Sequence, residues 1–408
     1  MILKFLGSLI PDFVKKQIYC FFQALTGYSP EIQSQHKLIE MLTEKKLILE
    51  HQVRRLEEVS KRLAAAVETV DSRLNAKTIL DVESDAVSCD GALIPSEAVQ
   101  IIIREGFDRY PGGIYNPGHF TCAGKSYLLA RGEKHMEIER ARDASKMMRG
   151  SAPLLTECSP DFTVQSMKEL QLVGFPSRVD FRAEDFRVFI FQEQVYAHHS
   201  LIQFPPYFRY RDDKTYFSKQ VISRVDIEKK QLVYCGAPAL DRNLALIEKN
   251  WLYLEHDGEV YLFYGFSPFY LVQKLVSWGR FEFKTFIDMP LRIFGLHHLP
   301  YVSFSSNPVE YDEKHYLLFV HARRGKQILD YLHWGVLISK TTLKPVFISK
   351  KPVLRGGNAR GVYPHVIFIT AVIPSGRDFD IIMGEGDYYS SVAKLERSLF
   401  EKNLISIE

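Results

Sequence analysis

The feature that most constrains the fold of this sequence is a hairpin pattern that recurs along its last three hundred or so residues. The clearest copy, residues 248–267, reads EKNWLYLEHDGEVYLFYGFS. Asp257-Gly258 separates two apolar runs, and Asp-Gly in that position predicts a tight β-turn because glycine accepts a positive φ. The copy begins with Glu248, Lys249 and Asn250, three polar groups that are costly to bury unless they bind one another or a ligand.

Four other segments repeat this design. They begin at Asn116, Glu184, Pro300 and Tyr363, and their predicted turns lie at residues 124–125, 192–194, 312–314 and 375–376. Further strand pairs lie between them, and the 21 Tyr and 28 Phe suit a chain rich in strands. A repeat of about 50–70 residues with roughly four strands is typical of a β-propeller blade. The sequence therefore predicts an all-β five-bladed β-propeller over residues 111–408.

The first 110 residues lack the hairpin pattern. In residues 1–35 the apolar residues recur at helical spacing, but Pro11, Lys15 and Lys16 interrupt the run, which is therefore too broken to span a membrane. We expect an amphipathic helix that lies in a membrane interface, or alternatively packs on protein. The sequence also lacks a cleavable signal pattern, so a cytoplasmic protein at the inner face of a membrane is expected.

Residues 36–76 show a heptad pattern without Pro or Gly, in which Leu42, Leu49, Leu56 and Leu63 are seven residues apart. This pattern predicts an α-helical coiled coil, and hence a homo-oligomer. The alternative is a long helix that folds back on the propeller. Residues 77–110 are expected to be a linker with a short helix at about 96–105.

Charge and cysteine content exclude several kinds of partner. The net charge of +3 is too small for a broad nucleic-acid-binding surface. The five cysteines form no CxxC pair, which argues against a zinc site or a disulfide framework. Asp212-Asp213 is an isolated acidic pair in a charged loop. We therefore predict no metal, no cofactor and no nucleic acid.

The polar ends of the hairpins should meet, because the innermost strands of all blades line one central channel. Carboxylates placed with Arg and His suit sugars and phosphates, since carboxylates bind hydroxyls and move protons while cations hold phosphate oxygens. The alternative is that these residues form ion pairs between blades. The candidate residues are Asn116, Arg131, Glu184, Asp185, Arg187, His198, His199, Glu248, Lys249, Asn250, His321, Arg323 and Asp387.

Five motifs in register resemble a known family. NPGHFTCAGKSYLLARGE, AEDFRVFIFQEQVYAHH, EKNWLYLEHDGEVYLFY, YLLFVHAR and GEGDYYSSVAKL resemble successive blades of the β-mannoside phosphorylases and hydrolases of glycoside hydrolase family 130, and of the related β-mannosyltransferases. The resemblance covers residues 111–396. It implies a five-bladed propeller that acts on β-mannosides.

The resemblance also implies roles for individual residues. The family's Glu-Asp-Pro-Arg motif appears here as Glu184, Asp185, Phe186 and Arg187, with Phe in place of Pro, so Asp185 would be the general acid. The final-blade motif ends at Asp387, an implied ligand of sugar hydroxyls. His321 and Arg323 match a region that binds phosphate in phosphorylases. Asn116, Arg131, Glu184, Arg187, Glu248, Lys249 and Asn250 would complete the substrate site.

Three functions remain open from the sequence. The first is an inverting glycosyltransferase of surface-polysaccharide or glycolipid assembly, which uses a sugar nucleotide and is favoured by the N-terminal segments. The second is a β-mannoside phosphorylase that uses inorganic phosphate, or a hydrolase. The third is a sugar-binding propeller without turnover. The propeller alone does not choose among them, because each of the two reactions needs one acid/base group.

Overall fold

The computed structural model describes residues 87–407, except 143–149, 176–180, 204–216, 246, 294, 297–298, 300–301 and 325–329. The chain divides into two units, Met1–Asn75 and Ala76–Glu408. The predicted amphipathic helix (1–35) and the predicted coiled coil (36–76) lie outside the described residues, so both stay predictions.

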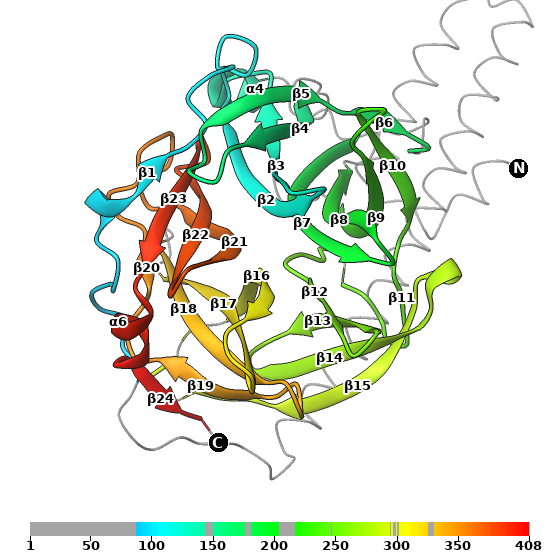
Figure 1. Cartoon of the computed structure of the whole chain (residues 1–408). Helices are drawn as coiled ribbons and strands as arrows, with labels where there is room; N and C mark the ends of the chain where they lie inside the picture. The colour runs from blue at the N-terminus through cyan, green and yellow to red at the C-terminus, as the bar shows by residue number, and fades with distance from the viewer. Residues whose placement is uncertain are drawn as a thin grey trace, which may run out of the picture. The chain divides into compact units, whose positions relative to one another are not determined.

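Five antiparallel meanders form five blades around a central channel, which confirms the predicted propeller (Figure 1). Blade 1 contains β2 (Ile114–Cys122), β3 (Lys125–Glu133), β4 (Ser151–Cys158) and β5 (Val164–Glu169). Blade 2 contains β7 (Phe181–Phe191), β8 (Gln194–Gln203), β9 (Phe217–Asp226), β10 (Gln231–Gly236) and the outer β6 (Gln171–Val173). Blade 3 contains β12 (Leu252–His256), β13 (Glu259–Gly265), β14 (Phe269–Ser277), β15 (Glu282–Pro290) and the outer β11 (Ala239–Leu240).

The remaining two blades follow the same plan. Blade 4 contains β16 (Ser303–Glu310), β17 (His315–Arg324), β18 (Asp330–Ser339), β19 (Pro345–Ser349) and β24 (Leu404–Ser406), and β20 (Leu354–Arg355) pairs with β18. Blade 5 contains β21 (Ile367–Ser375), β22 (Asp378–Glu385), β23 (Tyr389–Leu395) and β1 (Gln100–Ile101). The helical elements among the described residues of this unit are short: α4 (Glu137–Arg142), α6 (Arg397–Glu401), η1 (Ser96–Ala98) and η2 (Trp278–Arg280).

Residues ahead of blade 1 close the ring. β1 pairs antiparallel with β23, with Gln100 opposite Val392, so an N-terminal strand completes the last blade (Figure 1). The helix expected at about 96–105 is therefore only one turn of 3-10 helix, and the chain then becomes a strand. The run Val-Gln-Ile-Ile-Ile favours that outcome, because β-branched side chains fit a sheet edge better than a helix.

The core formed by the described residues consists of five clusters, one at each interface between neighbouring blades. Phe186 belongs to the cluster between blades 1 and 2, Tyr253 to the one between blades 2 and 3, and Phe304 to the one between blades 3 and 4. Phe319 and Ile114 mark the remaining two. The side chains of an innermost strand alternate between its two neighbouring interfaces. This alternation explains why the hairpins are apolar on both faces.

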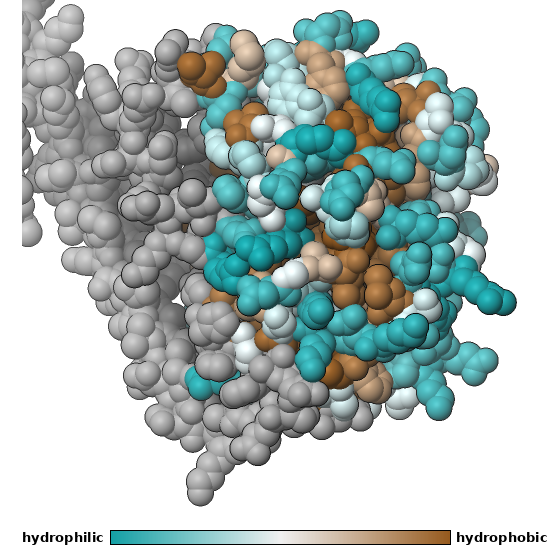
Figure 2. All heavy atoms as spheres, turned by 90° about the vertical axis from the view of Figure 1, so that its left-hand side faces the viewer, coloured by the Kyte–Doolittle hydropathy of each residue, from teal (hydrophilic) through white to brown (hydrophobic). Residues whose placement is uncertain are grey.

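The outer wall of the propeller differs from these interfaces. Figure 2 shows the flank that carries β1, β23 and α6, where hydrophilic residues are interspersed with small hydrophobic areas. Such a mixture is normal for a protein surface, because isolated exposed apolar residues cost little.

All five innermost strands (β2, β7, β12, β16 and β21) run in the same direction, so their first residues meet at one end of the channel, which we call the mouth. Three side chains cross the channel to backbone carbonyls of other innermost strands. Arg187 Nε donates to Ser305 O at 2.6 Å, Asn307 Nδ2 to Val188 O at 2.8 Å, and Thr370 Oγ1 to Pro117 O at 2.6 Å. These bonds satisfy edges that have no neighbouring strand.

At the other end the channel widens into a cavity of about 390 Å³ that all five innermost strands line. Its polar lining residues include His119, Thr121, Glu255, Asn307 and Thr370. None of the predicted site residues lines this cavity. Asn116 and Asp185 lie near the starts of β2 and β7, at the mouth, instead.

Candidate active site

Asp185 lies at the start of blade 2, where an extra residue in β7 bulges the strand toward the mouth. The pairing of β7 with β8 shifts between Glu184 and Arg187, and Asp185 has a φ of 59°. Asn116 occupies the corresponding bulge of blade 1, with a φ of 53°. Asn and Asp are the residues besides glycine that best tolerate this left-handed conformation. The Asn and Asp at the starts of these two hairpins are thus explained by the left-handed backbone they adopt as well as by the chemistry of their side chains.

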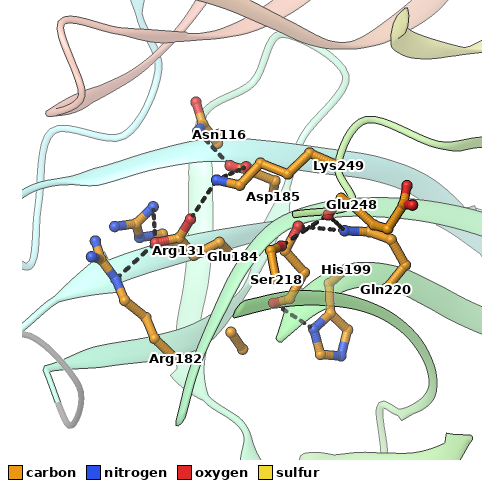
Figure 3. A network of polar contacts seen from close by, with 12 residues as sticks. Asn116, Arg131, Arg182, Glu184, Asp185, His199, Ser218, Gln220, Glu248 and Lys249 are labelled. Atoms are coloured by element: carbon orange, nitrogen blue, oxygen red, sulfur yellow. Dashed lines mark hydrogen bonds and ion pairs between the residues drawn. The ribbon is translucent and has the colours of Figure 1, made fainter. Parts of the chain in front are cut away.

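Two neighbours hold the Asp185 carboxylate (Figure 3). Asn116 Nδ2 donates to Asp185 Oδ1 at 2.9 Å, and Lys249 Nζ lies 3.9 Å from Asp185 Oδ2. The Asp185 side chain is 17% exposed, compared with 7% for Glu184 and 0% for Glu133. Asp185 is therefore the carboxylate of this cluster that a substrate in the mouth can reach.

Beside Asp185 lies a buried network of ion pairs that joins blades 1, 2 and 3 (Figure 3). Glu184 forms ion pairs with Arg131 Nη1 at 3.1 Å and Arg182 Nε at 2.9 Å, and accepts a hydrogen bond from Lys249 Nζ at 3.3 Å. Arg131 Nε and Arg182 Nη2 both bind Glu133 Oε1, the latter at 2.7 Å. The network contains three cations and, with Asp185, three carboxylates. Such compensation is what makes buried charge tolerable.

The pKa of Arg131 reflects this pairing. Burial alone would lower it, but the Glu133 and Glu184 carboxylates hold it well above its usual value. The Arg131 guanidinium also lies 4.8 Å from the centre of the Tyr115 ring. Arg131 is thus a permanently charged part of the wall.

Glu248 occupies the second network of Figure 3, which anchors the start of blade 3. Its Oε1 accepts from the Tyr264 hydroxyl at 2.8 Å and from the Ala245 N–H at 2.6 Å, and its backbone carbonyl accepts from Ser218 Oγ at 2.8 Å. Burial raises the pKa of Glu248, and the bond from Tyr264 opposes that rise. These contacts give Glu248 a structural task, and its predicted role as a substrate ligand stays a prediction.

Arg187 crosses the channel beneath Asp185. Its guanidinium is 5.1 Å from the centre of the Phe368 ring, and burial lowers its pKa to about 10, against the opposing effect of Asp185. His198, 1% exposed, and His321, 6% exposed, lie in the same region, and burial lowers the pKa of each well below its usual value. Both rings are therefore neutral at physiological pH. His321 binds Ser305 Oγ at 2.9 Å, so it can contribute a hydrogen bond but no charge to the predicted phosphate site.

The opposite side of the mouth gathers Arg323, Tyr331 and Asp387. Arg323 lies directly across from Tyr331 in the pairing of β17 with β18, and the Tyr331 ring stacks on His321 at 5.9 Å. Burial raises the pKa of Tyr331. The Arg323 charge lowers this pKa, and the Asp387 and Asp185 charges raise it. Arg323 is exposed, and Asp387 has a φ of 49°. Predicted residues of blades 2, 4 and 5 thus share one mouth.

Glu133, Arg182 and Tyr331 are the mouth residues that the sequence analysis missed. Glu133 lies two residues after Arg131, and Arg182 two residues before Glu184. In a strand that spacing places both members of each pair on one face, a signal that could have identified them. Tyr331 gave no such signal, because it lies outside the hairpin that contains β16 and β17. Asn250 has a φ of 64° and is partly buried just before β12.

Two searches of the described residues concern other chemistries. No group of three or more His, Cys, Asp or Glu side chains is placed to hold a metal ion. No helix in the described ranges is long and apolar enough to cross a membrane.

Comparison with known proteins was informative at the level of structure. No protein-family model and no curated protein sequence matches the chain. The β-1,2-mannobiose phosphorylase from Listeria innocua, solved with β-1,2-mannobiose, is 13% identical, with a TM-score of 0.53 over 76% of this chain and 97% of that chain. A glycosyl hydrolase from Bacteroides ovatus is 12% identical, with a TM-score of 0.53 over 76% and 95%.

A third structure comes from a study of glycoside hydrolase family 130, in which hydrolases among the mannoside phosphorylases target β-1,2 mannosidic linkages of Candida mannan. It is 13% identical, with a TM-score of 0.54 over 76% of this chain and 95% of that one. The chain has the fold of these proteins. The resemblance of the five hairpin motifs to family 130 is thus confirmed for the fold. A shared fold by itself does not fix the chemistry of a protein.

Proposed function

We propose that this chain is an enzyme that acts on β-mannosides by a single displacement at the anomeric carbon, with Asp185 as the acid/base group. The observation that carries the proposal is the placement of Asp185. It is a reachable carboxylate at the mouth of a channel, held at 2.9 Å by the Asn116 amide while its neighbours Glu184 and Glu133 are buried in ion pairs. Solved proteins with this fold include a mannobiose phosphorylase and glycosyl hydrolases.

The rest of the mouth supplies the other parts that such a reaction needs. Asp387 carries a carboxylate suited to sugar hydroxyls, and Tyr331 adds a phenol beside it. Arg323 is an exposed cation at the rim, where an anionic part of a substrate would lie. One face of the sugar would meet Asp185, and the incoming and departing groups would lie on opposite sides of the anomeric carbon.

Two features favour synthesis from a sugar nucleotide over breakdown of a mannoside. In synthesis the acceptor hydroxyl attacks the anomeric carbon, its proton passes to Asp185, and the nucleoside diphosphate leaves. That role uses the Asp185 carboxylate as the proton acceptor, and its oxygens lie 3.9 Å from the Lys249 ammonium and 2.9 Å from the Asn116 amide. In addition, Arg131, Arg182 and Lys249 already bind carboxylates, which leaves Arg323 at the rim to meet a diphosphate.

The finer proposal is therefore an inverting glycosyltransferase of surface-polysaccharide or glycolipid assembly. The segments predicted as an amphipathic helix (1–35) and a coiled coil (36–76) would hold an oligomer at the cytoplasmic face of a membrane, near a lipid-linked acceptor. The second candidate is a β-mannoside phosphorylase or hydrolase, which the activities named for the solved structures favour. In that direction Asp185 donates its proton to the glycosidic oxygen. A propeller that only binds sugar needs no acid at the bond.

One experiment separates these functions. The full chain is incubated with GDP-mannose and a mannosylated acceptor, and separately with β-1,2-mannobiose and inorganic phosphate, and the products are analysed. We expect an elongated acceptor in the first tube. Mannose 1-phosphate in the second tube with no product in the first would replace the transferase by the phosphorylase. Saturable binding of mannobiose without any product in either tube would leave the binding scaffold.

A further inference from the structure

We infer that Asn116 and Gly384 form a positioning device for Asp185: Asn116 orients the carboxylate, and Gly384 holds Asn116 in place. Asn116 is then a positioning residue, where the family resemblance implied a sugar ligand. The inference rests on the proposed function for its catalytic consequence. Its structural part, the dependence of the Asp185 geometry on Gly384, stands independently.

Asn116 faces Asp185 and is shielded from solvent. Asn116 is 6% exposed, and its Nδ2 donates to Asp185 Oδ1 at 2.9 Å. The amide oxygen Oδ1 has no hydrogen-bond partner among the described residues. A buried acceptor without a partner is normally costly, so the amide must be held in this orientation by other contacts. The reverse orientation would set its oxygen against the carboxylate.

Gly384 supplies that contact from blade 5. A Cβ placed on Gly384 would overlap Asn116 Oδ1 and would lie 3.0 Å from both Asn116 Cγ and the Asn116 backbone nitrogen. Gly384 does not have a left-handed φ, so its backbone does not require glycine. Glycine is needed at position 384 because a side chain there would occupy the space of the Asn116 amide. Blade 5 therefore forms the wall against which the blade 1 amide rests, while the amide binds the blade 2 carboxylate.

This part of blade 5 is rigid because Glu385, the residue after Gly384, is held by hydrogen bonds from Arg360 and Ser391. Glu385 Oε1 accepts from Arg360 N at 2.7 Å and Nε at 2.9 Å, and Glu385 Oε2 accepts from Arg360 Nη2 at 2.7 Å and Ser391 Oγ at 2.8 Å. A bidentate guanidinium–carboxylate pair fixes both distance and direction. The turn that carries Asp387 is thus also the support for Asp185, on the far side of the mouth.

Two variants test the device. Gly384→Ala adds a methyl group where the amide lies, and Asn116→Gly removes the amide while tolerating the φ of 53°. With the active substrate pair we expect each to lower kcat by about ten- to a hundredfold with KM changed less than about twofold, because sub-ångström misplacement of an acid/base group affects the reacting step. The double variant should be no slower than Asn116→Gly, since the added methyl group then has no amide to displace.

Gly335→Ala is the matched control. Gly335 is also a strand glycine without a left-handed φ, and its added Cβ would crowd the Phe400 ring, at 2.5 and 2.7 Å, on the outer side of blade 4. We expect this variant to lower the unfolding temperature but to leave kcat of the folded protein unchanged. A fall in kcat comparable with that of Gly384→Ala would show that crowding any strand glycine is enough, and would overturn the inference.

Crystallography of the variants provides a measurement that does not depend on catalytic turnover. Crystal structures of Gly384→Ala and Asn116→Gly should show the Asp185 carboxylate moved by about 0.5 Å or more, or in a second rotamer, which exceeds the tolerance of a productive site. An unmoved carboxylate in both variants would overturn the inference whatever the substrate. If Asp185→Asn is inactive while both variants keep wild-type kcat, the positioning role fails alone. If Asp185→Asn keeps its activity, the proposed function fails, and the crystal structures still decide the geometry.

Discussion

The two halves of the mouth carry polar groups at equivalent places in the propeller but keep them stable in opposite ways. On the side of blades 1 and 2, Arg131, Arg182, Glu133 and Glu184 are charged, buried and mutually paired. On the side of blade 4, His321 and His333 are buried and neutral, and both bind Ser305 Oγ. The difference teaches that the same topological position can be filled by compensated charge or by neutral hydrogen-bonding groups.

Arg187 and Asp185 lie where these two halves meet. Arg187 reaches from blade 2 to the carbonyl of Ser305 in blade 4, and the carboxylate that acts on its pKa is that of Asp185. The side of blades 1 and 2, which we call the charged half, thus supplies fixed charges around Asp185. The side of blade 4, which we call the neutral half, supplies uncharged rings.

The largest effect is expected at Asp185. Asp185→Asn should lose about a hundred- to ten-thousandfold in kcat while folding normally, because one positioned acid/base group contributes that much to a rate. Asp387→Asn, on the other side of the mouth, is the matched change and should mainly raise KM. Steady-state kinetics with circular dichroism as the folding control gives the answer. Equal losses of kcat in the two variants would remove the distinction between the two carboxylates.

The second prediction concerns stability. Glu133→Gln leaves Arg131 and Arg182 short of a buried counter-charge, which should cost about 3–5 kcal/mol of unfolding free energy. His333→Gln replaces a neutral ring with a neutral amide, and should cost only about 1–2 kcal/mol, the range of a hydrogen-bonding mismatch. Urea denaturation of both variants measures the difference. If His333→Gln is as damaging as Glu133→Gln, the two halves are not stabilised differently.

The third prediction is a pH dependence that belongs to the neutral half. Burial lowers the pKa of His333 to about 4 from an ordinary value of 6.5. The unfolded chain therefore binds more protons between these values, so the stability that the neutral rings contribute is full above pH 6.5 and is lost as pH falls toward 4. We expect a loss of roughly 1–3 kcal/mol per buried histidine over that window.

Denaturation at pH 7 and pH 5 tests this dependence. In His333→Gln the difference between the two pH values should shrink, because one titrating group is gone. Arg131 and Arg182 remain charged throughout this window. A pH dependence that is unchanged in His333→Gln would contradict the assignment.

The smallest effect is expected at Arg323, the exposed cation at the edge of the mouth, which we call the rim. Arg323→Ala should raise KM for the anionic substrate about ten- to a hundredfold, because a hydrogen bond to a charged group contributes about 1.5–3 kcal/mol. Its unfolding free energy should change by less than about 0.5 kcal/mol, since Arg323 is exposed. Arg131→Ala should show the reverse pattern, with a large loss of stability. An unchanged KM in Arg323→Ala would exclude the rim as the place of the anion.

Much of the fold could be read from the sequence because propeller blades are local structures. The turns at Asp257-Gly258 and at residues 192–194 and 375–376 join strands that are adjacent in both sequence and space, so their signals are complete within about twenty residues. The closing strand β1 could not be read this way. Its partner β23 lies almost three hundred residues away, and nothing local marks Gln100 and Ile101 as part of blade 5.

For the site, the sequence by itself determined which residues could reach the mouth. It placed Asp185, Asn116 and Asp387 at hairpin ends, where polar residues that tolerate a left-handed backbone are needed, and the direction of the innermost strands then brought them together. Only the tertiary structure decided what each one binds. The pairing of Glu184 with Arg131, the anchoring of Glu248 by Tyr264 and the contact of Gly384 with Asn116 each join different strands or different blades. Such contacts depend on how sheets pack face to face at sub-ångström precision, which periodicity along a chain does not encode.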